Sequence, residues 1–382
     1  MNAAPATPAP KVRNAYIDSL RGWSIFGVIC VHFAGSFVTT DIHAWSPSFY
    51  LGLGLNQFFS FAVPLFVLLS GLLAGSSTRK VTLAEYYVGR FWRIVVPYLI
   101  ASVPVFFLLN HYAQWRELPG LGDKLIWLVQ HVGFYGVEPT LYFIPLIITL
   151  YLFQPVLKAL PRWLNRLVPA ISPAGFALLL FSLFLVLHVT LGVLCNRGTL
   201  NYYVWGRPNA LFWVCYFFLG LHFGTLTALL TRRVIIGIAL VAVLVALGAL
   251  LWNANQFLDR SIVGAHFELN RLDFAYARPV MLIYDLAVTL FLVTGVALDW
   301  KTRENAISYL GRYTLEIYLW HILVLYYGAW RFPETLAACR AVPELIIIIC
   351  ATTAFVIAWF TNARHRLVAY LSQHRVAIIP MK

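Results

Sequence analysis

The sequence predicts an all-α protein that crosses a membrane about ten times. Of its 382 residues, 61% are hydrophobic and only 11% are charged, whereas a soluble domain carries about 25% charged residues. This composition, with a mean hydropathy of +0.77, excludes an ordinary soluble globular protein. The second observation is a series of apolar runs of about 20 residues, the length that spans the hydrocarbon core of a bilayer.

Ten such runs follow one another along the chain, and each is predicted to form a membrane-spanning helix. They lie near residues 17–38, 55–75, 92–110, 140–158, 173–195, 210–230, 234–252, 278–298, 312–331 and 342–361. The apolar segment 125–137 is too short to cross, and we expect an interfacial or re-entrant helix there. The chain then divides into a disordered cytoplasmic tail (1–15), a membrane domain (16–362) and a cytoplasmic C-terminal tail (363–382).

The distribution of basic residues predicts the orientation of the protein. Ten crossings place both termini on one side, and 18 of the 28 Lys and Arg residues fall in the loops and tails of that side, against nine on the other. Because basic residues concentrate on the cytoplasmic side, we expect cytoplasmic termini and an inner-membrane location. The net charge of +13 is then explained by topology and anionic lipid, and no nucleic-acid partner is expected.

The first apolar run contains two ionisable residues, Arg21 and His32. Eleven helical steps of about 100° return to nearly the same face, so the two side chains share one stripe about 16 Å apart. Ionisable residues inside a membrane span are costly and indicate function. Asp18, one turn before Arg21, could orient it. The structural alternative for His32 is a polar residue that bonds a neighbouring helix.

The third run is entered through a basic segment. Arg90 and Arg93 are three residues apart and project from one helix face, and Arg79 and Lys80 precede them. A pair of guanidinium groups suits a polyphosphate, because each can bond two oxygens at once. The alternative is that these residues only reflect the concentration of positive charge on the cytoplasmic side.

Two further runs carry polar residues. In the second run, Ser70 and Gly71 would allow close approach of another helix, which is the packing interpretation of small residues in a membrane. In the ninth run, Glu316 and His321 lie about 140° apart on the helix and cannot both face one site. Arg312 is four residues before Glu316, so an ion pair between them is an alternative role for this glutamate.

The five cysteines are scattered and show no metal-ligand spacing, so no metal site is expected. Cys195 and Cys339 both map to the outer side, and whether they pair is left open. No fixed repeat is visible, which weighs against a transporter built from inverted repeats.

Six segments in this order resemble the acyltransferase-3 family of integral membrane acyltransferases. They cover nearly all the predicted spans, and the ordered set is more specific than any one segment. They are IDSLRG at 17–22, with His32 following, VPLFVLLSG at 63–71, RFWRIVVP at 90–97, LYFIPLIITLYLFQP at 141–155, WVCYFFLG at 213–220 and LGRYTLEIYLWH at 310–321.

The resemblance implies transfer of an acyl group, usually acetyl, from cytosolic acyl-CoA to a hydroxyl of a glycan. It also implies that Arg21 and His32 are essential and that Arg90 and Arg93 act at the CoA end of a ten-helix core. Another branch of the family has a glutamate pair in the fourth span, where this chain reads LYFIPLIITLY, so no catalytic carboxylate is carried over. We expect a short polysaccharide-modifying type without an added extracytoplasmic domain.

The chemistry predicts roles for these residues. A thioester is already activated, so the enzyme must deprotonate and align a hydroxyl and stabilise the oxyanion. Burial disfavours the charged imidazolium, so His32 is expected to be a neutral general base. Arg21 would anchor a carbonyl or the pyrophosphate of the CoA arm. An acyl-His32 relay remains the mechanistic alternative.

The remaining assignments complete the predicted site. Acyl-CoA is expected as a donor substrate, and no resident cofactor is expected. Ser70 is assigned to donor binding together with Arg21, Arg90 and Arg93. Asp18 is assigned to the catalytic group together with Arg21 and His32. Glu316, His321 and Tyr142 are assigned to the acceptor. The outer loops 111–139 and 253–278 could hold the glycan through Trp115, His131, Glu138, Asp259, His266, Glu268 and Asp273.

Two other functions fit the composition. A transporter of a lipid-linked glycan would have a similar number of spans and buried charges, but would not consume acyl-CoA. A non-enzymatic scaffold of a polysaccharide assembly would tolerate loss of His32. A homo-oligomer is possible in each case.

Overall fold

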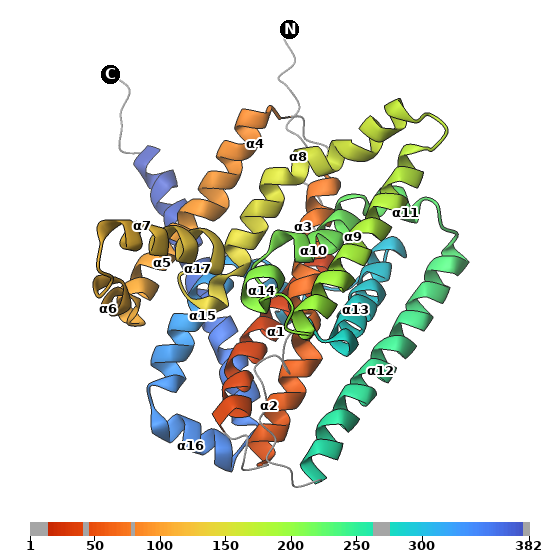
Figure 1. Cartoon of the computed structure of the whole chain (residues 1–382). Helices are drawn as coiled ribbons and strands as arrows, with labels where there is room; N and C mark the ends of the chain where they lie inside the picture. The colour runs from red at the N-terminus through yellow and green to blue at the C-terminus, as the bar shows by residue number, and fades with distance from the viewer. Residues whose placement is uncertain (1–13, 41–45, 78–80, 263–275, 377–382) are drawn as a thin grey trace, which may run out of the picture.

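The computed structural model describes residues 14–40, 46–77, 81–262 and 276–376, and in these ranges it contains helices and no strand. The all-α fold is therefore confirmed (Figure 1). The helices are α1 (Ala15–Thr40), α2 (Pro47–Phe58), α3 (Ala62–Gly75), α4 (Leu83–Arg90), α5 (Val96–Leu108), α6 (His111–Arg116), α7 (Leu121–Gln130), α8 (Phe143–Leu167), α9 (Pro173–Asn196), α10 (Ala210–Leu221), α11 (Phe223–Thr227), α12 (Arg232–Ile262), α13 (Pro279–Ala297), α14 (Ala306–Gly311), α15 (Thr314–Leu325), α16 (Pro333–Ala341) and α17 (Leu345–Val376).

Within the described residues, eight helical segments are long and apolar enough to cross a membrane. They correspond to eight of the ten predicted spans, which makes the chain a polytopic membrane protein. Of the other two predicted spans, 210–230 divides into α10 and α11 at His222, and each of these two helices is shorter than a bilayer crossing requires. In 312–331 the helix begins at Thr314 and continues from α15 into a π-helical turn, Tyr326–Trp330.

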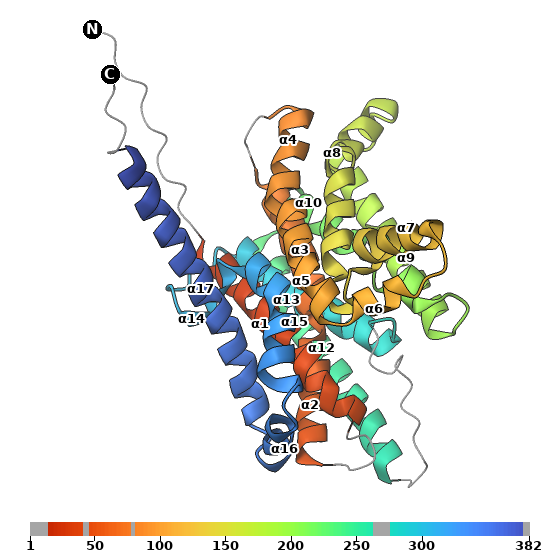
Figure 2. The same ribbon diagram turned by 90° about the vertical axis from the view of Figure 1, so that its left-hand side faces the viewer.

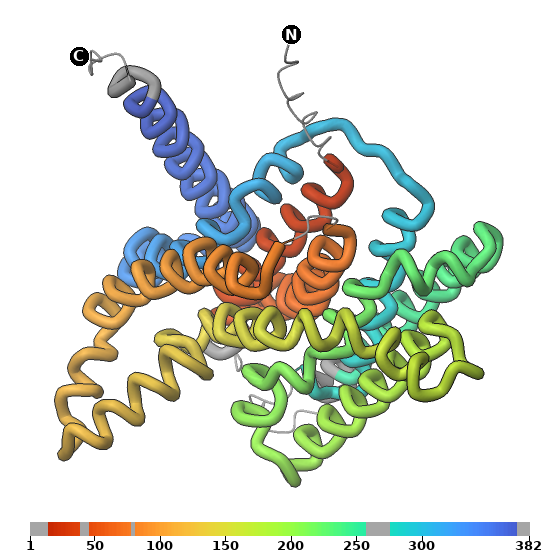
Figure 3. The backbone as a smooth tube through the Cα atoms, turned by 90° about the horizontal axis from the view of Figure 1, so that it is seen from above, coloured from red at the N-terminus to blue at the C-terminus, as the bar shows by residue number. Residues whose placement is uncertain are grey.

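α10 and α15 lie in the interior. Every residue of α10 from Phe212 to Leu221 is buried, and α10 packs against α3, α8 and α9. Seen from above, α1 and α3 also lie toward the middle of the bundle (Figure 3). These elements contact protein rather than lipid, so their backbone can be interrupted without exposing polar groups to hydrocarbon.

The long peripheral helices show the opposite pattern. α12 follows one edge of the bundle (Figure 1) and α17 another (Figure 2). On α12 the side chains of Leu240, Val241 and Leu244 are 60–69% exposed, as expected of a helix whose outer face contacts lipid. α17 continues to Val376, beyond residue 362 where the membrane domain was predicted to end.

Two ends of the bundle are used as reference points below. The α4 end is the end at which α4 begins, and the end of α8 lies there too; the α16 end lies opposite and contains α16 (Figure 1). Pro97 near the start of α5 cannot donate a backbone hydrogen bond, and the preceding turn, Phe91–Val95, is π-helical. This turn joins α4 to α5 and carries Arg93.

The remaining predicted features lie in short helices or outside the described residues. The segment 125–137 forms part of α7 and a π-helical turn, His131–Tyr135, and is too short to cross, as predicted. The tail 1–13, the basic residues Arg79 and Lys80, and the candidate acceptor residues His266, Glu268 and Asp273 lie outside the described residues.

Candidate functional site

Arg21 is held on α1 by a close helix crossing. A Cβ atom at Gly22 would lie 1.9 Å from the carbonyl oxygen of Ile307, so only glycine permits this approach of α1 to α14. The Arg21 guanidinium donates a hydrogen bond of 2.7 Å to Thr314 Oγ1 on α15 and lies 3.7 Å from the Asp18 carboxylate. Asp18 is therefore placed where it can orient Arg21, as predicted.

The Arg21 side chain lines a pocket of about 200 Å³ between α1, α3, the π-helical turn Phe91–Val95, α8 and α15. Ser70 also lines it, so the structure brings together these two residues assigned to the donor. The other lining residues are Phe66, Leu69, Leu73, Ile94, Phe143, Ile144, Ile147, Tyr151, Thr314, Leu315 and Tyr318. We call this the Arg21 pocket. Its wall is mainly apolar, with one cation.

A larger pocket of about 670 Å³ opens beside α4 and α8. Its cations are Arg90, Arg93, Lys158 and Arg162, and we call it the basic pocket. The carboxylate that lines this pocket belongs to Glu85. It caps the N-terminus of α4 by accepting a hydrogen bond from the Thr82 backbone N–H. Arg90 and Arg93 thus share one pocket, as their spacing predicted.

Arg90 and Tyr151 stand between the two pockets. The guanidinium carbon of Arg90 lies 3.8 Å from the centre of the Tyr151 ring, a close cation–π contact. Arg90 lines the basic pocket and Tyr151 lines the Arg21 pocket. Both residues also line a third, mainly apolar pocket of about 370 Å³.

The His32 imidazole faces into the protein and stacks on His321 of α15. The ring centres are 5.3 Å apart and the planes are inclined by 23°. His321 is fully buried, and its Nδ1 lies 2.6 Å from the Tyr318 carbonyl oxygen. Because a carbonyl can only accept, Nδ1 carries the proton, and the His321 Nε2 has no hydrogen-bond partner among the described residues.

Tyr318 connects the histidine pair to the Arg21 pocket. Its ring lines that pocket and its centre is 5.6 Å from that of His321. The Tyr318 hydroxyl donates to the Thr140 carbonyl oxygen at 2.5 Å, which fixes the ring beside the start of α8. His32 does not line the Arg21 pocket, so Tyr318 separates the two groups predicted to act together.

Tyr142, assigned to the acceptor, is buried. The guanidinium carbon of Arg207, which precedes α10, lies 4.8 Å from the centre of the Tyr142 ring. Sequence reasoning counted Arg207 only as a loop cation. The aromatic run YYVWG before it was the available signal.

A buried carboxylate was also missed. Asp285 on α13 is 2% exposed and accepts a hydrogen bond of 2.5 Å from Ser60 Oγ. An acidic residue inside the predicted span 278–298 is the same signal that drew attention to Arg21 and His32.

The Arg312–Glu316 ion pair, one alternative for this glutamate, does not form among the described residues. Arg312 pairs instead with Glu304. The helix breaks at Arg312 and Tyr313, between α14 and α15, so the four-residue spacing no longer places the two side chains on one helix face. Glu316 does not line the Arg21 pocket, and the structure does not bring it to His32 and His321.

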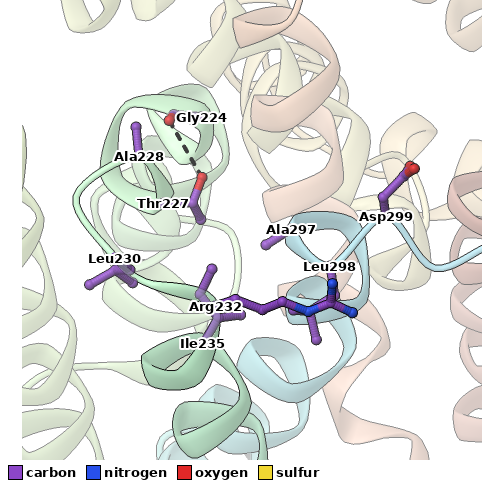
Figure 4. Close-up of a pocket in the computed structure, with 9 residues that line it drawn as sticks. All are labelled: Gly224, Thr227, Ala228, Leu230, Arg232, Ile235, Ala297, Leu298 and Asp299. Carbon is purple, nitrogen blue, oxygen red and sulfur yellow. Dashed lines mark hydrogen bonds between the residues drawn. The ribbon is translucent and has the colours of Figure 1, made fainter.

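The cysteines and one further pocket lie apart from the site. All five cysteines are free and buried, so Cys195 and Cys339 form no disulfide. A pocket of about 420 Å³ lies between α11, the start of α12 and the end of α13, with Arg232 extending across it (Figure 4). None of the predicted site residues lines this pocket.

Comparison with known proteins gives one match. A family model described as an acyltransferase domain, Acyl_transf_3, matches residues 14–363. No curated protein matches the chain, and no solved structure matches it. The matched range contains all the residues described above for the two pockets and the histidine pair.

Proposed function

Because the chain belongs to the acyltransferase-3 family of membrane acyltransferases, we propose that it moves an acetyl group from cytosolic acetyl-CoA to a hydroxyl of an extracytoplasmic or lipid-linked glycan. The observation that carries this proposal is the order of the polar groups. The basic pocket, the Arg21 pocket and the His32–His321 pair follow one another, joined by Tyr151 and Tyr318.

The basic pocket suits the phosphates of the donor. Arg90, Arg93, Lys158 and Arg162 line one space, and guanidinium groups bind phosphate oxygens in pairs. The mainly apolar Arg21 pocket would take the pantetheine arm, with Arg21 and Ser70 meeting its amide carbonyls.

His32 is the proposed general base. It removes the proton of the acceptor hydroxyl as the oxygen attacks the thioester carbonyl carbon. The carbon–sulfur bond then breaks, and His32 returns the proton to the CoA thiolate. His321 restrains the His32 ring by stacking, and its own orientation is fixed by the Tyr318 carbonyl.

A second route for the acyl group is an acyl-His32 intermediate, in which the imidazole attacks the thioester first. Trapping radiolabelled acetyl on His32 by acid quench supports this relay. Direct transfer predicts no label on His32 at any quench time, while the labelled glycan ester still accumulates.

Mass spectrometry of surface and periplasmic glycans tests the function directly. Cells with the protein should contain glycans heavier by one acetyl group, and cells without it or with His32→Ala should lack them. A transporter would change the amount of exported glycan without changing its ester content. A scaffold would keep full ester content with His32→Ala, which would contradict the proposed catalysis.

A further inference from the structure

The pocket of about 420 Å³ between α11, the start of α12 and the end of α13 takes no part in the proposed transfer (Figure 4). We call it the α12 pocket. Its lining residues are Gly224, Thr227, Ala228, Leu230, Arg232, Ile235, Ala297, Leu298 and Asp299. This set combines one guanidinium and one carboxylate with several apolar side chains. A ligand that complements all of it therefore has a charged part and an apolar part.

Both sides of the α12 pocket are held by contacts within the protein. At the end of α13, the Trp300 backbone N–H donates a hydrogen bond of 2.8 Å to the Gly295 carbonyl oxygen. The Trp300 ring packs edge to face on Tyr16 of α1, with the ring centres 5.9 Å apart. On the α11 side, the Thr227 hydroxyl donates to the Phe223 carbonyl oxygen at 2.8 Å. The fold thus provides this pocket without a ligand.

The charges at the α12 pocket favour an anion. The Asp299 carboxylate accepts a hydrogen bond of 2.5 Å from Lys301 Nζ, so its charge is compensated within the protein. Arg232 extends across the pocket (Figure 4) and forms no ion pair with a described residue. A guanidinium group binds phosphate oxygens in pairs. A phosphate is therefore the anion that this arginine suits best.

The level of the α12 pocket in the membrane indicates where this phosphate comes from. The apolar span on α12 begins at Arg232 and the span on α13 ends at Ala297, and both residues line the pocket. The pocket thus lies at the boundary of two spans, where lipid headgroups are found. Exposed apolar side chains, those of Leu229, Val234 and Leu240, continue from it along the surface. Figure 1 shows α11 nearer the α4 end than the α16 end.

We propose that the α12 pocket binds the headgroup of an anionic phospholipid, with the phosphate on Arg232 and the acyl chains along the exposed apolar face of α12. A carboxylate has about four acceptor positions, so Asp299 can accept from a headgroup hydroxyl while it is bonded to Lys301. Phosphatidylglycerol supplies both the net negative charge and the hydroxyls. Phosphatidylcholine supplies neither, because its quaternary ammonium group compensates the phosphate and has no hydrogen to donate.

Native mass spectrometry of the delipidated full-length protein in a neutral detergent tests this site. Titration with dioleoylphosphatidylglycerol or dioleoylphosphatidylcholine gives the dissociation constant of the first bound lipid. We expect the wild type to bind the phosphatidylglycerol about tenfold more tightly than the phosphatidylcholine, a factor that corresponds to about 1.4 kcal/mol. Ammonium acetate at about 0.15 M limits diffuse charge attraction, because the Debye length is then about 8 Å.

Two charge variants distinguish a bound headgroup from general attraction. Arg232→Gln should lower the affinity for phosphatidylglycerol about tenfold, to the value for phosphatidylcholine. Arg233→Gln removes the same charge at the next residue, which does not line the pocket, and should change the affinity less than about twofold. Both side chains are exposed, so neither variant should lower the apparent Tm.

A steric variant tests whether the headgroup enters the α12 pocket. A Cβ atom at Gly224 meets no atom within 4 Å, so Gly224→Leu should occupy the pocket without displacing the backbone. We expect it to lower the affinity for phosphatidylglycerol about tenfold. Gly237→Leu is the matched control, because Gly237 also has open space around it but does not line the pocket. Its affinity should equal that of the wild type.

Three results would overturn the inference. Equal affinities in Arg232→Gln and Arg233→Gln would mean that the pocket arginine has no particular role. A loss in Arg232→Gln with none in Gly224→Leu would place the phosphate outside the pocket. Displacement of the bound lipid by an equal concentration of glycerol 3-phosphate would mean that the pocket takes a soluble phosphate. None of these measurements uses acyl-CoA, so they leave the proposed transfer untouched.

Discussion

Individual polar residues in this protein are explained by the need to satisfy hydrogen-bonding groups away from water. Arg21 meets Thr314 and Asp18, and Asp285 meets Ser60. Four buried side-chain nitrogen atoms lack a hydrogen-bond partner among the described residues: the Nε2 atoms of His188 and His321 and the Nε atoms of Arg207 and Arg312. Of these side chains, His321 stacks on His32, which is where a substrate is proposed to react.

Thr314→Val tests the position of Arg21. Valine has the same shape but removes the oxygen that accepts from the guanidinium, and hydrogen bonds to charged groups contribute about 1.5–3 kcal/mol. If Arg21 contacts the donor, we expect the KM for acetyl-CoA to rise roughly tenfold, since 1.4 kcal/mol corresponds to a factor of ten. Steady-state transfer kinetics in membranes measure this.

Thr361→Val is the matched control. Thr361 lies on α17 and bonds only the Ile357 carbonyl of its own helix, so its removal should leave the KM unchanged. An unchanged KM for Thr314→Val as well would contradict the donor-side role of Arg21.

At the residue scale, the sequence was most informative where a charge interrupts an apolar run. This signal predicted Arg21 and His32, and it would also have found Asp285. Arg207 could not be found in this way, because it lies in a loop, and only the fold brings its side chain over the Tyr142 ring.

Glycine residues allow some of the helices to cross at close distance. A Cβ atom at Gly71 would lie 2.1 Å from the Phe217 carbonyl oxygen, so α3 and α10 approach each other backbone to backbone. The neighbouring Ser70 lines the Arg21 pocket. The packing interpretation of Ser70 and Gly71 is therefore confirmed for Gly71, whereas Ser70 faces a pocket.

Gly71→Ala is expected to destabilise the protein. The added methyl group must push α3 from α10, and overpacking of this kind costs about 1–3 kcal/mol. A lower apparent Tm in detergent should report it. Gly237→Ala on α12 is the control, because a Cβ there meets no atom within 4 Å and alanine favours the helix. Equal Tm values for the two variants would contradict the close crossing.

At the element scale, hydropathy predicted the long spans well because lipid imposes their length. It could not predict that 210–230 divides at His222. α10 is buried in protein, so no such length rule applies to it. The helix break at Arg312 and Tyr313 explains why the Arg312–Glu316 pair, one alternative for this glutamate, does not form.

At the scale of the whole molecule, the charged and polar groups of the proposed site follow a path into the bundle and do not gather at one point. The basic pocket opens beside α4 and α8, and the histidine pair lies further inside. The excess of basic residues predicts that the α4 end faces the cytoplasm, which would place the basic pocket where acyl-CoA is found.

Cysteine labelling tests this orientation. In spheroplasts, a membrane-impermeant maleimide should label Glu334→Cys on α16 without lysis, and Ser77→Cys near the α4 end only after lysis. Background labelling should be low, since the native cysteines are buried and burial raises the pKa of the Cys339 thiol, which disfavours the reactive thiolate. The reverse labelling pattern would contradict the predicted orientation.

The central claim, that an acetyl group passes from a cytosolic thioester through the His32 site to a glycan, is tested most directly with radiolabelled acetyl-CoA and sealed membrane vesicles containing the glycan. Inside-out vesicles, which present the cytoplasmic face, should incorporate label into glycan, and sealed right-side-out vesicles should not. His32→Ala should lower incorporation by at least 100-fold, the lower range for loss of a general base. Equal incorporation by the wild type and His32→Ala would contradict the account.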